Sequence, residues 1–206
     1  MDQRSDEWFA ARLGRVTASR VADLMAKTKS GPSASRGNYM ADLIVERLTG
    51  IRPEGFTNAA MVWGTETEPQ ARAAYEFLTD AEVIEEGFVL HPAIADFGAS
   101  PDGLVGEDGL LEVKCPATAT HIETLLTETV PAKYITQMQA QMACTGRAWC
   151  DFVSFDPRMP GDMQLFVRRV ARDDAFITQM EGEITSFLAE LAQKLDALRS
   201  RYAVAA

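Results

Sequence analysis

The sequence predicts a mixed α/β fold in a single domain that spans residues 1–206. A chain of 206 residues is too short for two full domains of about 150 residues each. Hydrophobic residues make up 47% of the chain and charged residues 24%, which is typical of a globular protein with a sizeable core. Helical patterns come first, followed by a β hairpin and then by helix, strand, strand and helix. This order favours an α/β domain.

Four helices and one loop are expected in the first 80 residues. A short helix begins at Ser5 and is stopped by Gly14, and Thr17 or Ser19 can cap a second helix. The stretch 27–37 is rich in Lys, Ser, Gly and Pro, and it therefore predicts a loop. Two further helices are predicted over residues 38–49, ended by Gly50, and over residues 67–78.

The middle of the chain changes from helical to strand patterns. Residues 83–84 and 88–90 favour short strands, and the tight turn 106–109 joins the stretch 97–105 to a compact strand over 110–115. This arrangement predicts a hairpin. The remaining elements are expected as helices over 120–127 and 132–144, strands over 148–155 and 164–170, and a long amphipathic helix over 173–201.

Residue counts and spacing exclude several classes of protein. The three cysteines cannot all pair and show no C-x-x-C spacing, so neither a disulfide framework nor a cysteine zinc site is supported. The two histidines, His91 and His121, leave a zinc metalloprotease motif without ligands, and no glycine-rich nucleotide-binding loop is present. The N-terminal residues lack the pattern of a signal peptide, and no stretch approaches about 18 apolar residues. A cytoplasmic protein with no membrane partner is expected.

The charge of the chain is unevenly distributed. A net charge of −10 argues against a protein that coats nucleic acid. Between Trp8 and Arg52, however, eight basic residues stand against three acidic ones. This local surplus fits either a solvated helical surface or a confined anion-binding patch on a body that repels nucleic acid elsewhere.

The residues with the clearest chemical pattern are Asp102, Glu112 and Lys114. On a strand, Glu112 and Lys114 are two residues apart and share a face. If the turn 106–109 folds the strands together, Asp102 comes alongside Glu112, and two carboxylates in such proximity repel unless a cation joins them. A hard ion such as Mg²⁺ would satisfy both. Lys114 could then neutralise an anionic transition state or hold the attacking water of a phosphodiester hydrolysis.

A structural interpretation of the same residues stays open at this point, because Asp-Gly pairs are common in turns and Glu112 with Lys114 could be the exposed face of an edge strand. Glu66 and Glu68 are equally ambiguous, since an acid in the first turn of a helix is favoured whatever its function. Of Gln137, Gln139 and Gln141, at most one or two can face a common site, because alternate residues spread around a helix. Most of these glutamines are expected on the solvated surface.

Several motifs together carry a family resemblance. Ser100-Pro101-Asp102-Gly103 precedes Glu112-Val113-Lys114-Cys115-Pro116 and follows Trp63-Gly64-x-x-x-Glu68. In this order they resemble the PD-(D/E)xK nucleases, and specifically the phage λ exonuclease (YqaJ-like) family of alkaline exonucleases. Further matching motifs bring the resemblance to residues 8 to about 160: Trp8-x-x-x-Arg12-Leu13-Gly14-x-x-Thr17-Ala18-Ser19, Ala71-Arg72, Gln137-x-Gln139 and Asp156-Pro157-Arg158-Met159.

The resemblance implies a restriction-endonuclease-like PD-(D/E)xK core, with a mixed central sheet flanked by helices. It also implies a role for each matching position. Asp102 and Glu112 would bind the metal with the Val113 carbonyl, and Lys114 would be the catalytic lysine. Glu68, which lies four residues after Gly64, matches the acid of the helix, and Gln137 matches the active-site glutamine. Arg12 and Ser19 match the pair that receives a terminal 5′-phosphate.

The activity implied by the resemblance is a Mg²⁺-dependent 5′→3′ exonuclease, for which Mn²⁺ could substitute. It would degrade one strand of double-stranded DNA from its end to mononucleotides and leave a 3′ single strand for homologous recombination in a phage or prophage. A ring-shaped homotrimer and a single-strand annealing protein are the partners implied. A ring with basic residues on its channel would reconcile the charge of −10 with DNA binding. The alternatives are a PD-(D/E)xK endonuclease and a non-catalytic DNA-end-binding protein.

Overall fold

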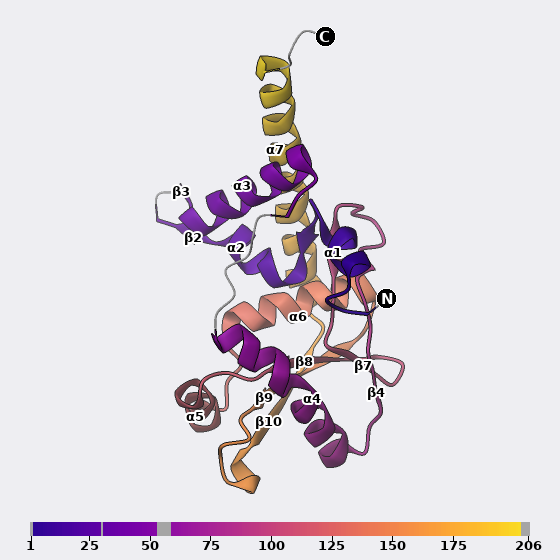
Figure 1. Ribbon diagram of the computed structural model, residues 1–206, viewed down its shortest axis with the longest axis vertical. Coiled ribbons are helices and arrows are strands. Elements are labelled where there is room, and N and C mark those ends of the chain that lie inside the picture. Colours follow the sequence, from indigo (N-terminus) through magenta and orange to yellow (C-terminus); the bar gives the residue numbers. More distant parts are fainter. Residues whose placement is uncertain (1, 30, 53–58, 203–206) are drawn as a thin grey trace.

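The computed structural model describes residues 2–29, 31–52 and 59–202. Its centre is a mixed five-stranded sheet with the strand order β10-β9-β8-β7-β4 (Figure 1). β8 and β9 run parallel, while the other three neighbouring pairs are antiparallel. The strands are β4 (Val83–Ile84), β7 (Gly103–Val105), β8 (Gly109–Lys114), β9 (Trp149–Phe155) and β10 (Leu165–Ala171).

Two smaller sheets lie outside this central sheet. The first has three strands in the order β1-β6-β5, formed by β1 (Val16–Thr17), β6 (Phe97–Ala99) and β5 (Val89–Leu90). The second is the short hairpin of β2 (Lys27–Thr28) and β3 (Gly31–Pro32). Because β1 pairs with β6, the N-terminal segment is joined to the chain that leads into β7.

Helices cover both faces of the central sheet. On one face, α4 (Ala59–Thr79) packs Ala71 and Tyr75 against buried side chains of β8 and β9. On the other face lies α6 (Ala132–Thr145), with α2 (Val21–Met25), α3 (Ala34–Thr49) and α7 (Asp174–Tyr202) in the same core cluster. The remaining helical segments are α1 (Asp6–Arg12), η1 (Ala18–Arg20), α5 (Thr118–Thr127) and η2 (Gly161–Met163). The expected mixed sheet flanked by helices is confirmed.

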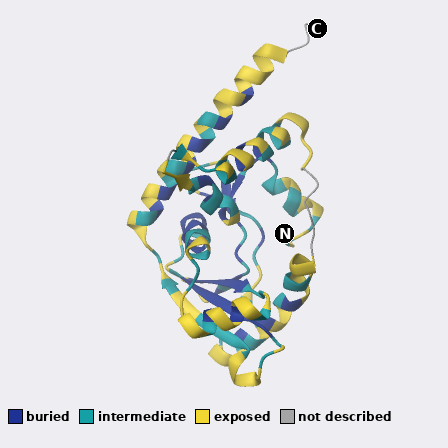
Figure 2. Ribbon diagram, turned by 90° about the vertical axis from the view of Figure 1, so that its left-hand side faces the viewer, coloured by how far each residue is buried: buried dark blue, intermediate teal, exposed yellow. Residues whose placement is uncertain are grey.

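α6 is the most enclosed helix in the described part of the chain, because every residue from 138 to 144 is buried. α7 covers it with one apolar face that repeats every three or four residues, from Ile177 to Leu195. The last turns of α7, residues 196–202, are exposed and project beyond the body (Figure 2). No helix in the described ranges is long and apolar enough to cross a membrane.

Two expectations about the first 80 residues are wrong. The stretch 27–37 is not a plain loop, because it holds the β2–β3 hairpin and the start of α3, whose N-cap Ser33 accepts a hydrogen bond from the Arg36 amide at 3.2 Å. Neither Thr17 nor Ser19 caps α2, since Thr17 is extended and Ser19 lies inside η1.

α4 also differs from the expectation, because it begins eight residues before 67, at Ala59. Gly64 and Pro69 both lie inside this helix and interrupt its helical pattern in the sequence. The predicted hairpin is confirmed by the register of Gly103 opposite Leu111 and Val105 opposite Gly109.

Gly109 of β8 lies close to the Trp149 ring of β9, and this contact allows the packing of the two strands to be tested. A Cβ at Gly109 would lie 2.1 Å from the Trp149 ring. The Arg169 guanidinium also contacts this ring, since it lies 3.4 Å from the ring centroid and is itself bound to Asp151 at 2.8 and 2.9 Å. The ring therefore has little freedom to move away.

We expect Gly109→Ala to lower the free energy of unfolding by about 1–3 kcal/mol, because the added methyl group overpacks the β8–β9 contact. Gly37→Ala is the matched control, since Gly37 lies in α3 and a Cβ there meets nothing within 4 Å. The control should be neutral or stabilising by up to about 1 kcal/mol. Equal stability of both variants in urea denaturation would contradict the tight packing of Gly109 against Trp149.

Candidate active site

Asp102 and Glu112 meet where β7 begins and β8 ends. The β7–β8 register brings the Asp102 amide to the Leu111 carbonyl at 3.2 Å, and the Val113 amide donates to Asp102 Oδ2 at 2.7 Å. Burial and the nearby charge of Glu112 raise the pKa of Asp102 to about 8. Ionising both carboxylates is therefore unfavourable without a cation, as expected for a cation-binding pair.

Glu112 is fully buried and both of its carboxylate oxygens accept hydrogen bonds. Gln137 Nε2 donates to Oε1 and Gln141 Nε2 donates to Oε2, each at 2.6 Å. Lys114 Nζ forms an ion pair with Oε1. The strand alternation expected from the sequence is confirmed, since Glu112 and Lys114 share one face while Leu111 and Val113 join the core beneath α4.

Gln141 is a further residue of the candidate site, because it contacts Glu112 and the sequence did not single it out. It lies one turn after Gln137 on α6, and this i, i+4 spacing is the signal that places both side chains over one carboxylate. The expectation of a solvated surface is wrong for Gln139 and Gln141, which are both buried. Gln139 points elsewhere, because it donates to the Ala171 carbonyl at 2.8 Å and accepts from the Asp173 amide at 2.9 Å.

Lys114 is held as a cation at this site. Burial opposes the protonated form, but the charges of Glu112 and Asp102 outweigh it and raise the pKa of Lys114 above its usual value. Its Nζ also lies 5.2 Å from the centroid of the Tyr134 ring. The ammonium group is therefore charged at neutral pH and fixed in direction.

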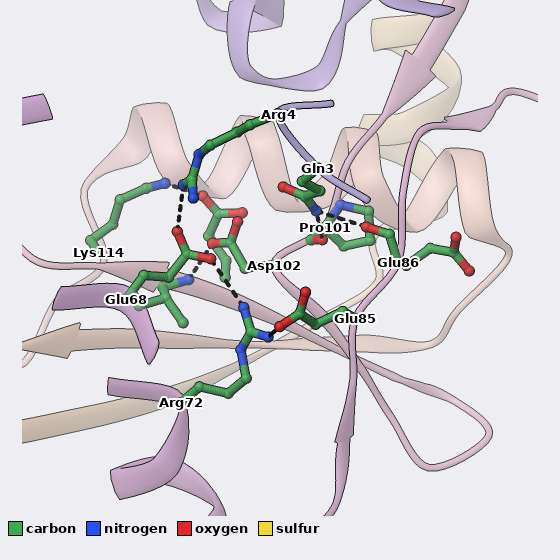
Figure 3. A network of polar contacts seen from close by, with 11 residues as sticks. Gln3, Arg4, Glu68, Arg72, Glu85, Glu86, Pro101, Asp102 and Lys114 are labelled. Carbon is green, nitrogen blue, oxygen red and sulfur yellow. Dashed lines mark hydrogen bonds and ion pairs between the residues drawn. The ribbon is translucent and has the colours of Figure 1, made fainter. Parts of the chain in front are cut away.

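Glu68 of α4 faces the same cleft as Asp102 and Lys114, whereas Glu66 is exposed and does not line it. Figure 3 shows Glu68 between two arginines: Arg4 Nη2 donates to Oε2 at 2.8 Å, and Arg72 Nη2 donates to Oε1 at 3.1 Å. Its negative charge adds to those that raise the pKa of Asp102. The charge of Glu68 on α4 is therefore felt by Asp102, as are the charges of Glu112 and Lys114 on β8.

The cleft has a volume of about 860 Å³. Its walls include the acids Glu68 and Asp102, Val113, and three cations, Arg4, Lys114 and Lys133. A smaller pocket of about 160 Å³ adjoins it, since Ser19 and Asp102 line both. The smaller pocket is also lined by Gln3, Trp8, Arg12, Ala18, Ser100 and Gln137.

Arg12 is the cation of the smaller pocket. Its guanidinium lies 4.1 Å from the centroid of the Trp8 ring and donates from Nη1 to Ser100 Oγ at 3.2 Å. Burial lowers the pKa of Arg12 to about 10, although it remains protonated at neutral pH. Within the described residues it forms no ion pair with a carboxylate, so the pocket offers a desolvated positive charge to an anion.

Half of the eight basic residues between Trp8 and Arg52 are neutralised by ion pairs, in line with the solvated-surface interpretation. Four of these residues are in ion pairs: Arg20 with Asp23 and Asp42, Lys27 with Glu183, Arg36 with Glu190, and Arg47 with Asp96. Arg12 differs from them, because its contacts are aromatic rings and a hydroxyl. The anion-binding interpretation is therefore retained for the pocket around Arg12.

The residues of the cleft fit a divalent metal ion. Within the described ranges, no three Asp, Glu, His or Cys side chains are grouped so that they could hold a metal by themselves. A hard cation such as Mg²⁺, however, prefers oxygen ligands. Such oxygens are offered by the carboxylates of Asp102 and Glu112 and by the Val113 carbonyl. The raised pKa of Asp102 points the same way, because a cation would relieve the repulsion between the two carboxylates.

Comparison with known proteins places these features in a family. Residues 7–148 match the YqaJ-like viral recombinase domain. The chain is 58% identical to the alkaline exonuclease LHK-Exo of Laribacter hongkongensis, with 97% of this chain and 98% of that chain covered and a TM-score of 0.91. For LHK-Exo in complex with dAMP the identity and coverage are the same and the TM-score is 0.92.

A more distant similarity shows the fold alone. A phage-related exonuclease from Haemophilus somnus 129PT is 14% identical, with a TM-score of 0.73 over 89% of this chain and 96% of that chain. No curated protein matches the sequence significantly.

The hydrogen bonds to Glu112 can be tested by a double-mutant cycle. Gln141→Ala leaves a buried carboxylate oxygen without its donor, so it should lower the free energy of unfolding by about 1–3 kcal/mol. When Glu112→Gln is already present, Gln141→Ala should lower the free energy of unfolding by a smaller amount, with a difference of at least about 0.5 kcal/mol. Gln139→Ala is the control, because Gln139 is buried yet does not touch Glu112. Additive effects of Gln141 and Glu112 would show that this contact does not hold the carboxylate.

Proposed function

Because this chain belongs to the YqaJ-like viral recombinase family, we propose that it is a metal-dependent exonuclease that degrades one strand of double-stranded DNA in the 5′→3′ direction. The family resemblance carried by the sequence motifs is confirmed. The observation that carries the proposal is the cleft lined by Asp102 and Lys114, which adjoins the Arg12 pocket and has Glu112 buried directly behind Lys114. The whole chain, residues 1–206, would act as one exonuclease domain.

The products proposed are mononucleotides and a 3′ single strand that serves homologous recombination. LHK-Exo binds dAMP, a deoxynucleoside monophosphate, and this supports the release of mononucleotides by its relative. The cleft of about 860 Å³ is large enough for a nucleotide beside the carboxylates.

Each residue of the cleft has a role in the proposed hydrolysis. Asp102, Glu112 and the Val113 carbonyl would hold Mg²⁺, for which Mn²⁺ could substitute. Such an ion, when bound, polarises the scissile phosphate and lowers the pKa of water. Gln137 and Gln141 hold the Glu112 carboxylate in one orientation by donating to both of its oxygens. Lys114 places a fixed positive charge where negative charge develops on the phosphate.

The Arg12 pocket would receive the 5′-phosphate of the substrate strand. A terminal phosphate carries more negative charge than an internal one, and the guanidinium fork matches its oxygens. Ser19 adds a hydroxyl beside Asp102, where the two pockets meet. Binding of the end at Arg12 would fix which phosphodiester lies over the carboxylates.

The proposed assembly is a homotrimeric ring that encloses the duplex and works with a single-strand annealing protein. Closed cyclic symmetry would keep the enzyme on its substrate, and the acidic outer surface would disfavour nonspecific binding. Basic contacts confined to the channel of such a ring would reconcile the net charge of −10 with DNA binding.

An end-labelled duplex and a closed circle, each incubated with Mg²⁺, test the activity directly. The wild type should release labelled mononucleotides from the duplex and leave the circle intact, whereas an endonuclease would cut both.

Lys114→Ala should lower the rate by about 100-fold or more, because it removes a preorganised charge from the transition state. Lys133→Ala should cost less, since Lys133 lines the cleft but forms no ion pair with a carboxylate among the residues that the structure describes.

Near-normal turnover of Lys114→Ala would remove this residue from the mechanism. Asp102→Ala and Glu112→Ala should raise the Mg²⁺ concentration needed for half-maximal activity or abolish activity altogether. Binding of DNA ends without any cleavage by the wild type would instead favour a non-catalytic end-binding protein.

The 5′-phosphate pocket predicts a preference for phosphorylated ends. The wild type should degrade a 5′-phosphoryl duplex faster than a 5′-hydroxyl duplex, and Arg12→Ala should lose most of that preference. Initial rates on the two duplexes give the ratio for each protein. Full preference in the variant would show that Arg12 only covers apolar surface beside Trp8.

The ring predicts a particle of about three times the mass of one chain in sedimentation equilibrium. Its assembly state should persist at the concentrations at which long duplexes are digested processively. A monomer under these conditions would contradict the ring without contradicting the nuclease chemistry.

A further inference from the structure

The segment before α1 reaches into the catalytic cleft. Arg4 lines the cleft together with Asp102 and Lys114, and its Nη2 donates to Glu68 Oε2 at 2.8 Å (Figure 3). Gln3 lines the adjoining Arg12 pocket. Two consecutive residues of this segment therefore form walls of the two pockets, and neither was singled out in the sequence.

The backbone of this segment is fixed on both sides of Arg4. Gln3 Nε2 donates to the Glu86 carbonyl at 2.7 Å and to the Pro101 carbonyl at 2.8 Å, next to Asp102. Ser5 caps α1 by accepting from the Trp8 amide at 3.2 Å. The position of Arg4 over the cleft is thus set by contacts that do not involve its own side chain.

Stability does not account for an arginine at this position. The φ angle of Arg4 is 71°, in the left-handed region that favours glycine and strains residues with a Cβ. An exposed ion pair adds little stability, and the Arg4 side chain is 49% exposed. The pair with Glu68 therefore does not fully offset the backbone strain.

Glu68 does not need Arg4 to stay in place. Its other oxygen accepts from Arg72 Nη2 at 3.1 Å, and Arg72 also pairs with Glu85. Arg4 uses only Nη2 in this contact, so its Nε and Nη1 have no hydrogen-bond partner in the part of the chain that the structure describes. The Arg4 guanidinium can exchange Glu68 for another anion while Arg72 still neutralises the carboxylate.

A phosphodiester group is the anion that fits this cleft. A strand whose 5′-phosphate lies at Arg12 would continue past Asp102 into the cleft that Arg4 lines, since the two pockets adjoin there. Lys114 is engaged with Glu112, whereas Arg4 is half exposed and has free donors. Its planar fork matches two phosphate oxygens.

We propose that Arg4 binds an internal phosphate of the DNA strand in the catalytic cleft and rests on Glu68 in the free protein. This inference rests on the proposed nuclease function, which supplies the strand. Arg4 is then a substrate-binding residue, and it sets how the strand lies between the end pocket and the carboxylates.

Arg4→Gly is the sharpest variant, because glycine adopts a φ of 71° without strain and the protein should fold at least as well as the wild type. The assay is fluorescence anisotropy with a 5′-phosphorylated duplex, with Ca²⁺ in place of Mg²⁺ to suppress cleavage. Arg4→Gly should weaken Kd about tenfold at low salt and reduce the slope of log Kd against log salt by about one. Arg168→Ala is the matched control, since Arg168 is 47% exposed and pairs with one glutamate outside the cleft.

Duplexes with one neutral methylphosphonate linkage identify the phosphate. At one position in the first few nucleotides, the neutral linkage should weaken binding by the wild type and have no further effect on Arg4→Gly. An unchanged Kd and salt slope in Arg4→Gly, or a loss confined to kcat, would overturn the inference, because the arginine would then act only through Glu68. If the wild type itself neither binds nor degrades duplex ends, the proposed function fails instead.

Discussion

The buried carboxylate of Glu112 is the constraint on which the rest of the structure depends. An ionised carboxylate removed from water costs several kcal/mol unless it is paired and hydrogen-bonded. Here the compensation comes from Gln137 and Gln141 of α6 and from Lys114 of the same strand. The helix must therefore lie over the end of β8 at one rotation and one height, and this requirement fixes how the two layers meet.

The same carboxylate explains the charges that surround it. Burial raises the pKa of Asp102, and the negative charge of Glu112 raises it further. The same negative charge raises the pKa of Lys114, so that this lysine stays protonated despite its burial. Glu68 approaches from the opposite layer, so helices on both faces of the sheet contribute to one cleft. The cleft thus combines carboxylates that suit a cation with arginine and lysine side chains that suit a phosphate. Phosphodiester hydrolysis requires both.

The parts of the site predicted from the sequence are those set by short-range geometry. The period of a strand placed Glu112 and Lys114 on one face, and the turn after Val105 brought Asp102 alongside them. Gln141 was missed because neighbouring glutamines at alternate positions hid the one-turn spacing. The position of Arg4 in the cleft could not be predicted from neighbouring residues, because its partner Glu68 is 64 residues away. Its left-handed backbone conformation could not be predicted either, because an arginine does not indicate one. Family resemblance supplied Glu68 and Arg12, which composition alone left ambiguous.

The enclosure of α6 divides the protein into regions of unequal local stability. A helix with seven consecutive buried residues can expose its amides only when the surrounding core opens, so its opening free energy should approach that of global unfolding. Glu112 is held by this slowest-opening element. Arg4 and Arg12 come from an outer segment and a short helix with no buried residues, which can open without disturbing the core. The side of the cleft that holds Glu112 should therefore exchange its amide hydrogens more slowly than the side formed by Arg4 and Arg12.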